Sequence, residues 1–161
     1  MTGKHLLGLL VLVSTGCDDA LVYQRDTLLP ENGWRSKDRP EFCFEITDTL
    51  RPHDLFIDVR HTGDYAYSDL FLFLDLTGPD GHRFRDTVEC TLADPSGRWY
   101  GRGTGFLFAD RFKAHVLFRT GNRFPHRGRY CIRMEQAMRT DPLPGITDVG
   151  VSVVLSKAQG G

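Results

Sequence analysis

The stretch from Tyr65 to Leu76, YAYSDLFLFLDL, constrains the fold more than any other part of this 161-residue chain. In an extended strand, its alternating leucines would point to one side, and Phe71 and Phe73 to the other. Both faces are then apolar over most of the length, which is typical of a central strand covered on both sides. The turn-forming sequence GPDG begins at Gly78, so we expect a hairpin into the next apolar run.

Apolar and polar side chains alternate with a period of two in several further segments, and this pattern predicts strands. The segments are 41–47, 55–60, 87–92, 112–119, 130–134 and 149–155. A glycine-dense run with aromatic residues, 99–108, is typical of a twisted or bulged strand. Leu21–Tyr23 is either a first strand or part of a tether. The sequence therefore predicts an all-β fold, an antiparallel β-sandwich of about seven to nine short strands.

The first 17 residues, MTGKHLLGLLVLVSTGC, have the pattern of an export signal, with a basic start at Lys4 and an apolar core that ends at Val13. The core is far shorter than the roughly 20 residues that a membrane-spanning helix needs. The sequence STGC resembles the lipobox of bacterial lipoproteins, although Ser14 stands where Leu is preferred. We therefore expect cleavage before Cys17 and a diacylated Cys17 as the lipid anchor. The alternative is ordinary signal peptidase cleavage, which would leave a secreted protein with a spare thiol.

This interpretation divides the chain into a cleaved signal peptide (1–16), a lipid-anchored tether with the first strand (17–33), a β-sandwich domain (34–156) and a tail (157–161). The whole chain carries 20 Lys and Arg against 21 Asp and Glu, a net charge of −1. A charge this close to zero argues against nucleic acid as a partner through bulk electrostatics.

Three further cysteines, Cys43, Cys90 and Cys131, each lie in an apolar or alternating run. Their spacing matches no CxxC metal site. Buried cysteines often serve as small hydrophobic side chains, and we favour that interpretation here. One disulfide with one free thiol is the alternative for an exported protein.

The sequence contains no catalytic motif with a nucleophile, a base and an acid at characteristic spacing. The GRGTG segment at 101–105 lacks the Gly-Lys-Ser/Thr of a phosphate-binding loop, and no HExxH or GxSxG motif occurs. The carboxylate pairs Asp18 with Asp19 and Asp64 with Asp69 could act as glycosidase acids, but acids beside turns are common. We predict no enzymatic activity, no metal site and no cofactor.

Five arginines lie within fifteen residues, together with His126: Arg119, Arg123, Arg127, Arg129 and Arg133. Guanidinium groups bind phosphates bidentately, so lipid headgroups or lipopolysaccharide are conceivable ligands. A solvated loop whose arginines pair with nearby acids is the simpler interpretation, and we favour it.

Two long blocks are specific enough to indicate a family. They are DTVECTLADPSGRWYGRGTG, which begins at Asp86, and GRYCIRMEQAMRTDPLPGITDVGVSV, which runs from Gly128 to Val153. Together with the lipobox, they resemble the GldH family, the gliding motility lipoproteins of Bacteroidota. The motif residues, which we expect to be mainly structural, are Asp86, Thr87, Leu92, Asp94, Gly97, Trp99, Gly101, Gly103, Tyr130, Met138, Gly145, Ile146, Val149 and Gly150.

The resemblance implies a non-catalytic cell-envelope lipoprotein required for the gliding machinery, which is associated with type IX secretion. Cys17 would hold it in the inner or outer membrane, facing the periplasm, and other envelope proteins of the machinery would be its partners. Members also occur in Bacteroidota that do not glide, so a more general envelope role stays open.

The segment from Gln136 to Arg139 ends a predicted strand. It is either a structural corner or part of a partner-binding face, and Gln136 and Arg139 are the candidate partner contacts. The alternative function is glycan binding by the sandwich. Trp34, Trp99 or Tyr100 would then stack on sugars, although we expect these aromatic residues to lie in the core.

Overall fold

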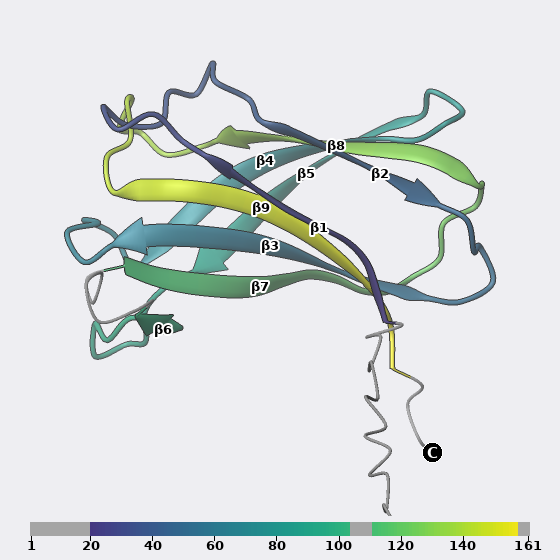
Figure 1. Cartoon of the computed structure of the whole chain (residues 1–161). Coiled ribbons are helices and arrows are strands. Elements are labelled where there is room, and N and C mark those ends of the chain that lie inside the picture. The colour runs from purple at the N-terminus through teal and green to yellow at the C-terminus, as the bar shows by residue number, and fades with distance from the viewer. Residues whose placement is uncertain (1–19, 104–110, 158–161) are drawn as a thin grey trace, which may run out of the picture.

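The computed structural model describes residues 20–103 and 111–157. The signal peptide, Cys17 and the end of the glycine-dense run, 104–110, lie outside the described residues. Within the described ranges, nine strands form two antiparallel sheets that pack face to face, which confirms the predicted β-sandwich (Figure 1). No helix that could span a membrane is found in the described part of the chain.

The larger sheet has the strand order β1-β9-β3-β7-β6 and the smaller one β2-β8-β4-β5. The strands are β1 (Leu21–Leu28), β2 (Glu41–Ile46), β3 (His53–Thr62), β4 (Asp69–Thr77), β5 (Arg83–Thr91), β6 (Arg102–Gly103), β7 (Arg111–Asn122), β8 (Gly128–Gln136) and β9 (Ile146–Leu155). The segment that sequence left open at Leu21–Tyr23 is therefore a strand. It is the edge of the larger sheet and pairs with β9, the last strand of the chain.

The predicted central strand is β4, which lies between β8 and β5. Leu70, Leu72 and Leu74 are buried between the sheets, but Phe71 and Phe73 are only half-buried on the outer face. The guanidinium of Arg85 lies 4.6 Å from the centre of the Phe73 ring, and the Met138 sulfur accepts a hydrogen bond from the Phe71 amide at 3.4 Å. The prediction of cover on both sides is therefore wrong, because single side chains shield this face where we expected a second layer.

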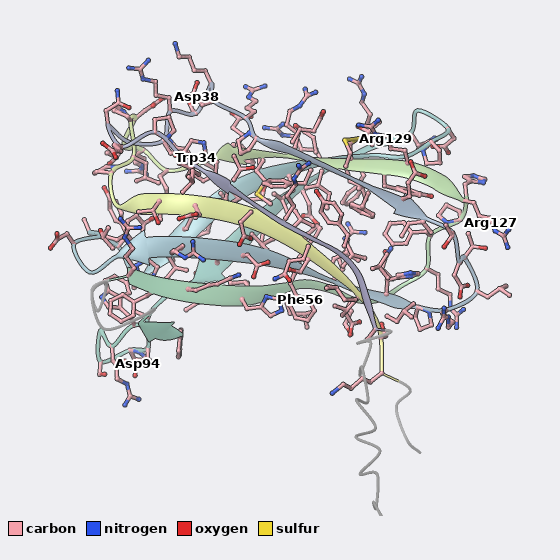
Figure 2. The ribbon with its side chains drawn as sticks, in the orientation of Figure 1. Trp34, Asp38, Phe56, Asp94, Arg127 and Arg129 are labelled. Carbon is pink, nitrogen blue, oxygen red and sulfur yellow. A yellow bond between two sulfur atoms is a disulfide. The ribbon has the colours of Figure 1, made fainter. Side chains whose placement is uncertain are left out.

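The antiparallel order places the connecting loops at two opposite ends of the sandwich (Figure 1). We call the end that includes Ala20, Leu155 and the loops 47–52, 78–82 and 123–127 the proximal end. The distal end consists of the loops 29–40, 63–68, 92–101 and 137–145. Trp34 and Asp38 lie at the distal end and Arg127 at the proximal end (Figure 2).

A disulfide joins Cys43 on β2 to Cys131 on β8. The two residues are register partners on the outer face of the smaller sheet. Cys90 is buried and free, and burial raises the pKa of its thiol to about 12. Our preference for three small hydrophobic cysteines is therefore wrong for two of them, because strand register brings together residues that are 88 positions apart.

Removal of this disulfide tests its contribution to stability. The link closes a loop of 88 residues, so it restricts the unfolded chain, and the Cys43→Ala, Cys131→Ala double variant should lose about 2 to 4 kcal/mol of unfolding free energy. Urea denaturation of the domain without its signal peptide measures this, with reduced wild type as the control that should match the variant. Equal midpoints for the oxidised wild type and the double variant would contradict a stabilising link.

Candidate functional site

The distal end is organised around the buried side chain of Trp34. The Trp34 amide donates to the Leu143 carbonyl, and the Leu143 amide donates to the Trp34 carbonyl, both at 2.8 Å. The indole Nε1 also donates to the Asp38 carbonyl at 2.7 Å. These bonds tie the loop 29–40 to the loop 137–145. Trp34 therefore belongs to the core and is not available to stack on a sugar.

Gln136 fixes the corner at which β8 ends. Its side chain is 1% exposed; its Nε2 donates to the Thr140 carbonyl at 3.1 Å, and its Oε1 accepts from the Met138 amide at 2.8 Å. The hydroxyl groups of Tyr67 and Thr140 lie 2.6 Å apart and share a hydrogen bond. The corner is thus closed by a buried amide, which suits the structural interpretation of Gln136 and not a contact with a partner. Arg139, in contrast, is exposed on this fixed corner.

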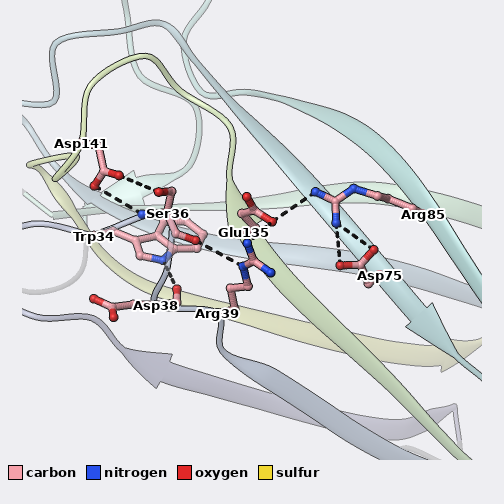
Figure 3. Close-up of polar contacts among 8 residues, drawn as sticks. All are labelled: Trp34, Ser36, Asp38, Arg39, Asp75, Arg85, Glu135 and Asp141. Carbon is pink, nitrogen blue, oxygen red and sulfur yellow. Dashed lines mark hydrogen bonds and ion pairs between the residues drawn. The ribbon is translucent and has the colours of Figure 1, made fainter.

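The neighbouring loop is held to the same corner by a carboxylate. Asp141 accepts from the Ser36 amide at 3.3 Å and from its hydroxyl at 2.6 Å. Figure 3 shows these two bonds beside the Trp34 ring. Two loops that are about a hundred residues apart in sequence therefore present one surface around Arg139.

A chain of four charged side chains extends from this corner over the outer face of the smaller sheet (Figure 3). We call Arg39, Glu135, Arg85 and Asp75 the charge chain. Glu135 lies 3.2 Å from Arg39 and 3.1 Å from Arg85, and Arg85 donates to both oxygens of Asp75 at 3.0 and 2.7 Å. The bonds to Glu135 and Asp75 raise the pKa of the Arg85 guanidinium.

Exposed ion pairs of this kind add little to the free energy of unfolding. Their effect is to hold the side chains in one arrangement, which lowers the ordering cost of binding a partner. Together, the distal corner and the charge chain form a rigid, mixed-charge surface, and we take them as the candidate site.

A second polar cluster lies on the outer face of the larger sheet, around Asp58. This carboxylate is 2% exposed, accepts from the Ser152 hydroxyl at 2.5 Å, and lies 2.7 Å from His115 Nδ1. The His115 ring stacks on Phe56 with 4.0 Å between centres. The serine is paired with the carboxylate and not with the imidazole, so this is not the Ser–His–Asp order of an activated nucleophile. The cluster instead connects β3, β7 and β9.

Among the described residues, one group of His, Cys, Asp or Glu side chains is compact enough to share a metal ion, namely Glu41, Cys43 and Cys131. Both sulfurs are bonded to each other in the disulfide. They are therefore not thiolates, the form in which cysteine ligates metals.

The arginine-rich segment does not form one site. Arg119 lies over the Phe84 ring and 3.4 Å from Asp86, while Arg133 pairs with Glu41 at 2.9 Å. Arg123 donates to the Leu50 carbonyl at the proximal end.

The motif residues occupy varied positions. Leu92, Tyr130, Ile146 and Val149 belong to the core, and Trp99 and Met138 are partly buried against it. Trp99 packs with its ring 4.6 Å from that of His61, whereas Tyr100 is 46% exposed. Asp94 closes its own turn by accepting from the Ser96 and Arg98 amides.

Two clusters were not found by sequence reasoning: the charge chain and the set around Asp58. The available signal was the polar residues at many outward positions of β3, β5 and β8, together with Asp75 near the end of β4. Whether these polar side chains lie close together depends on strand order and register, and the periodic sequence pattern specifies neither.

The fold and this surface place the chain among the antiparallel β-sandwich proteins with ordered loop corners. In such proteins, binding residues typically lie on the loops. Comparison with known proteins then identifies the family, since the model of the GldH lipoprotein family matches residues 21–153. The chain belongs to the GldH lipoprotein family.

Two relatives are similar over most of their length. A gliding motility lipoprotein GldH homolog of Christiangramia forsetii is 31% identical over 150 residues, which is 89% of each chain. The gliding motility lipoprotein GldH of Flavobacterium johnsoniae is 27% identical over 159 residues, or 94% of each chain. Among solved structures, a 4-O-methyl-alpha-glucuronidase of family GH115 aligns at 11% identity with a TM-score of 0.41; the alignment covers 96% of this chain and 20% of that enzyme. This likeness is too low to carry an argument.

Proposed function

We propose that this protein is a non-catalytic lipoprotein of the gliding machinery, which is associated with type IX secretion, and that it holds another envelope protein at its distal corner. Cys17 attaches it to the inner or outer membrane, with the domain in the periplasm. The observation that carries the proposal is the exposed Arg139 on a corner closed by buried Gln136, in a chain that matches the family over residues 21–153.

The distal corner suits protein binding for physical reasons. Arginine is frequent among the few residues that dominate an interface, and a corner that is already ordered loses little conformational freedom on binding. The charge chain adjoins it with both signs of charge, which favours a polar protein surface over nucleic acid. Gln136 supports the contact from within, and Arg139 makes it.

The anchor is tested by Cys17→Ser. Two acyl chains give stable membrane attachment, so the wild type should fractionate with membranes and carry diacylglycerol on its N-terminal peptide by mass spectrometry. The variant should be released or remain unprocessed. A variant that stays entirely in the membrane fraction, together with a wild type that carries no lipid, would contradict the proposed anchor.

The partner contact is tested by Arg139→Ala in the full-length chain. We expect copurification of envelope proteins from solubilised membranes to fall by roughly tenfold or more, because interface arginines often contribute 2 kcal/mol or more. In a gliding host, spreading on agar should fall with it. Arg127→Ala, which removes an exposed arginine at the opposite end, is the matched control and should change neither. If both variants bind and spread like the wild type, Arg139 is not the contact.

A further inference from the structure

The first described residue is tied closely to the body of the domain. The Ala20 carbonyl accepts from the Leu155 amide at 2.7 Å, and the next residue after Leu155, Ser156, donates its amide to the Pro52 carbonyl at 2.9 Å. Cys17 precedes Ala20 by three residues. Three extended residues span at most about 11 Å. Once Cys17 carries lipid, Ala20 at the proximal end must therefore lie within about 11 Å of the membrane surface.

The proximal end carries the most exposed large apolar side chain among the described residues, Leu50, at 79% exposure. Its carbonyl accepts a hydrogen bond from Arg123 of the facing loop, so the loops 47–52 and 123–127 hold each other. Beside them is a hollow of about 870 Å³ whose lining includes Ala20, Phe56, Val154 and the basic residues Arg123 and Lys157.

The acids at this end are largely committed to bonds within the chain. Hydrogen bonds from Arg51 lower the pKa of Asp48 to about 2. Burial alone would raise the pKa of Asp54, but hydrogen bonds from Ser156, Gly121 and Thr120 lower it. Both carboxylates are therefore ionised; Asp48 is neutralised by its ion pair with Arg51, whereas Asp54 is held by uncharged donors and keeps its negative charge.

The remaining charges nearly cancel. Arg123, Arg127 and Lys157 are exposed cations, and Asp54, Asp80 and the tether residues Asp18 and Asp19 supply four negative charges. A near-neutral surface with an exposed leucine suits zwitterionic phospholipid, whose phosphates accept hydrogen bonds from guanidinium and ammonium groups.

We propose that the proximal end rests on the headgroup layer of the anchoring membrane, with Leu50 inserted into that layer and Arg123 and Lys157 at its phosphates. This rests on the proposed function, because it needs lipid on Cys17. The domain then stands upright, and the distal corner with Arg139 faces away from the membrane.

The competing arrangement is a domain that lies flat on β1. That strand also exposes apolar side chains, at Leu21, Val22 and Leu28. Leu28 is 77% exposed, almost the same as Leu50 at 79%. It lies seven residues further along β1 than Leu21, about 23 Å at the usual strand rise. The two leucines are thus matched in type and exposure but differ in expected distance from the membrane.

The test uses the full chain, expressed in a host that lipidates it and reconstituted in vesicles of phosphatidylethanolamine and phosphatidylcholine. Benzoylphenylalanine replaces Leu50 in one variant and Leu28 in the other, and mass spectrometry after irradiation measures the fraction of each labelled peptide that is crosslinked to phospholipid. We expect at least fivefold more lipid crosslinking at position 50 than at position 28, with little change on raising the salt concentration.

Equal crosslinking at the two positions, or more at position 28, would overturn the upright arrangement while leaving the anchor intact. The intact mass of each variant is measured in the same samples. A mass without diacylglycerol would instead refute the proposed anchor, so the two failures are distinguishable.

Discussion

The pairing of β1 with β9 is the constraint on which the rest of the arrangement depends, because it joins the start of the domain to its last strand. Gly150 on β9 makes the pairing possible. A side chain there would collide with the Asp26 carboxylate and lie 2.6 Å from the Arg25 carbonyl, so β1 could not approach in this register. With β1 in place, the chain leaves the sandwich at Ala20, and the position of the tether relative to every loop is set.

This constraint gives the two ends of the sandwich different roles in the account we propose. The proximal end combines Leu50, a hollow and a near-neutral set of charges, which suits contact with lipid. The distal end combines a buried tryptophan, a closed corner and exposed charges held by one another, which suits contact with a protein. Ten-residue strands such as β3 and β9 keep the two ends apart, so one rigid body can serve both contacts.

Periodicity was sufficient to predict the all-β class, because the alternation in β2 and β8 reflects burial of one face, which is a local property. Strand order, the disulfide between Cys43 and Cys131 and the charge chain all depend on register between distant segments, which no local pattern contains. The prediction for the outer face of β4 was wrong for a related reason. Phe71 and Phe73 suggested a second covering layer, but Arg85 of the same sheet and Met138 of the adjoining corner shield them. The family motif pointed to Gln136 and Arg139 together. The structure separates them, because Gln136 is buried and supports the corner, whereas Arg139 is exposed and accessible to a partner.

The orientation of the domain on its membrane is the central claim, and neutron reflectometry of the lipidated chain on a supported bilayer measures it most directly. Strands of ten residues rise about 3.3 Å per residue, so an upright sandwich with its loops should form a protein layer of about 35 to 45 Å. Two sheets packed about 10 Å apart, with their outer side chains, should form a layer of about 25 Å when lying flat. The thicker layer is the predicted result. The thinner one would place β1 along the membrane, bring the distal corner down to the lipid and contradict the division of roles between the two ends.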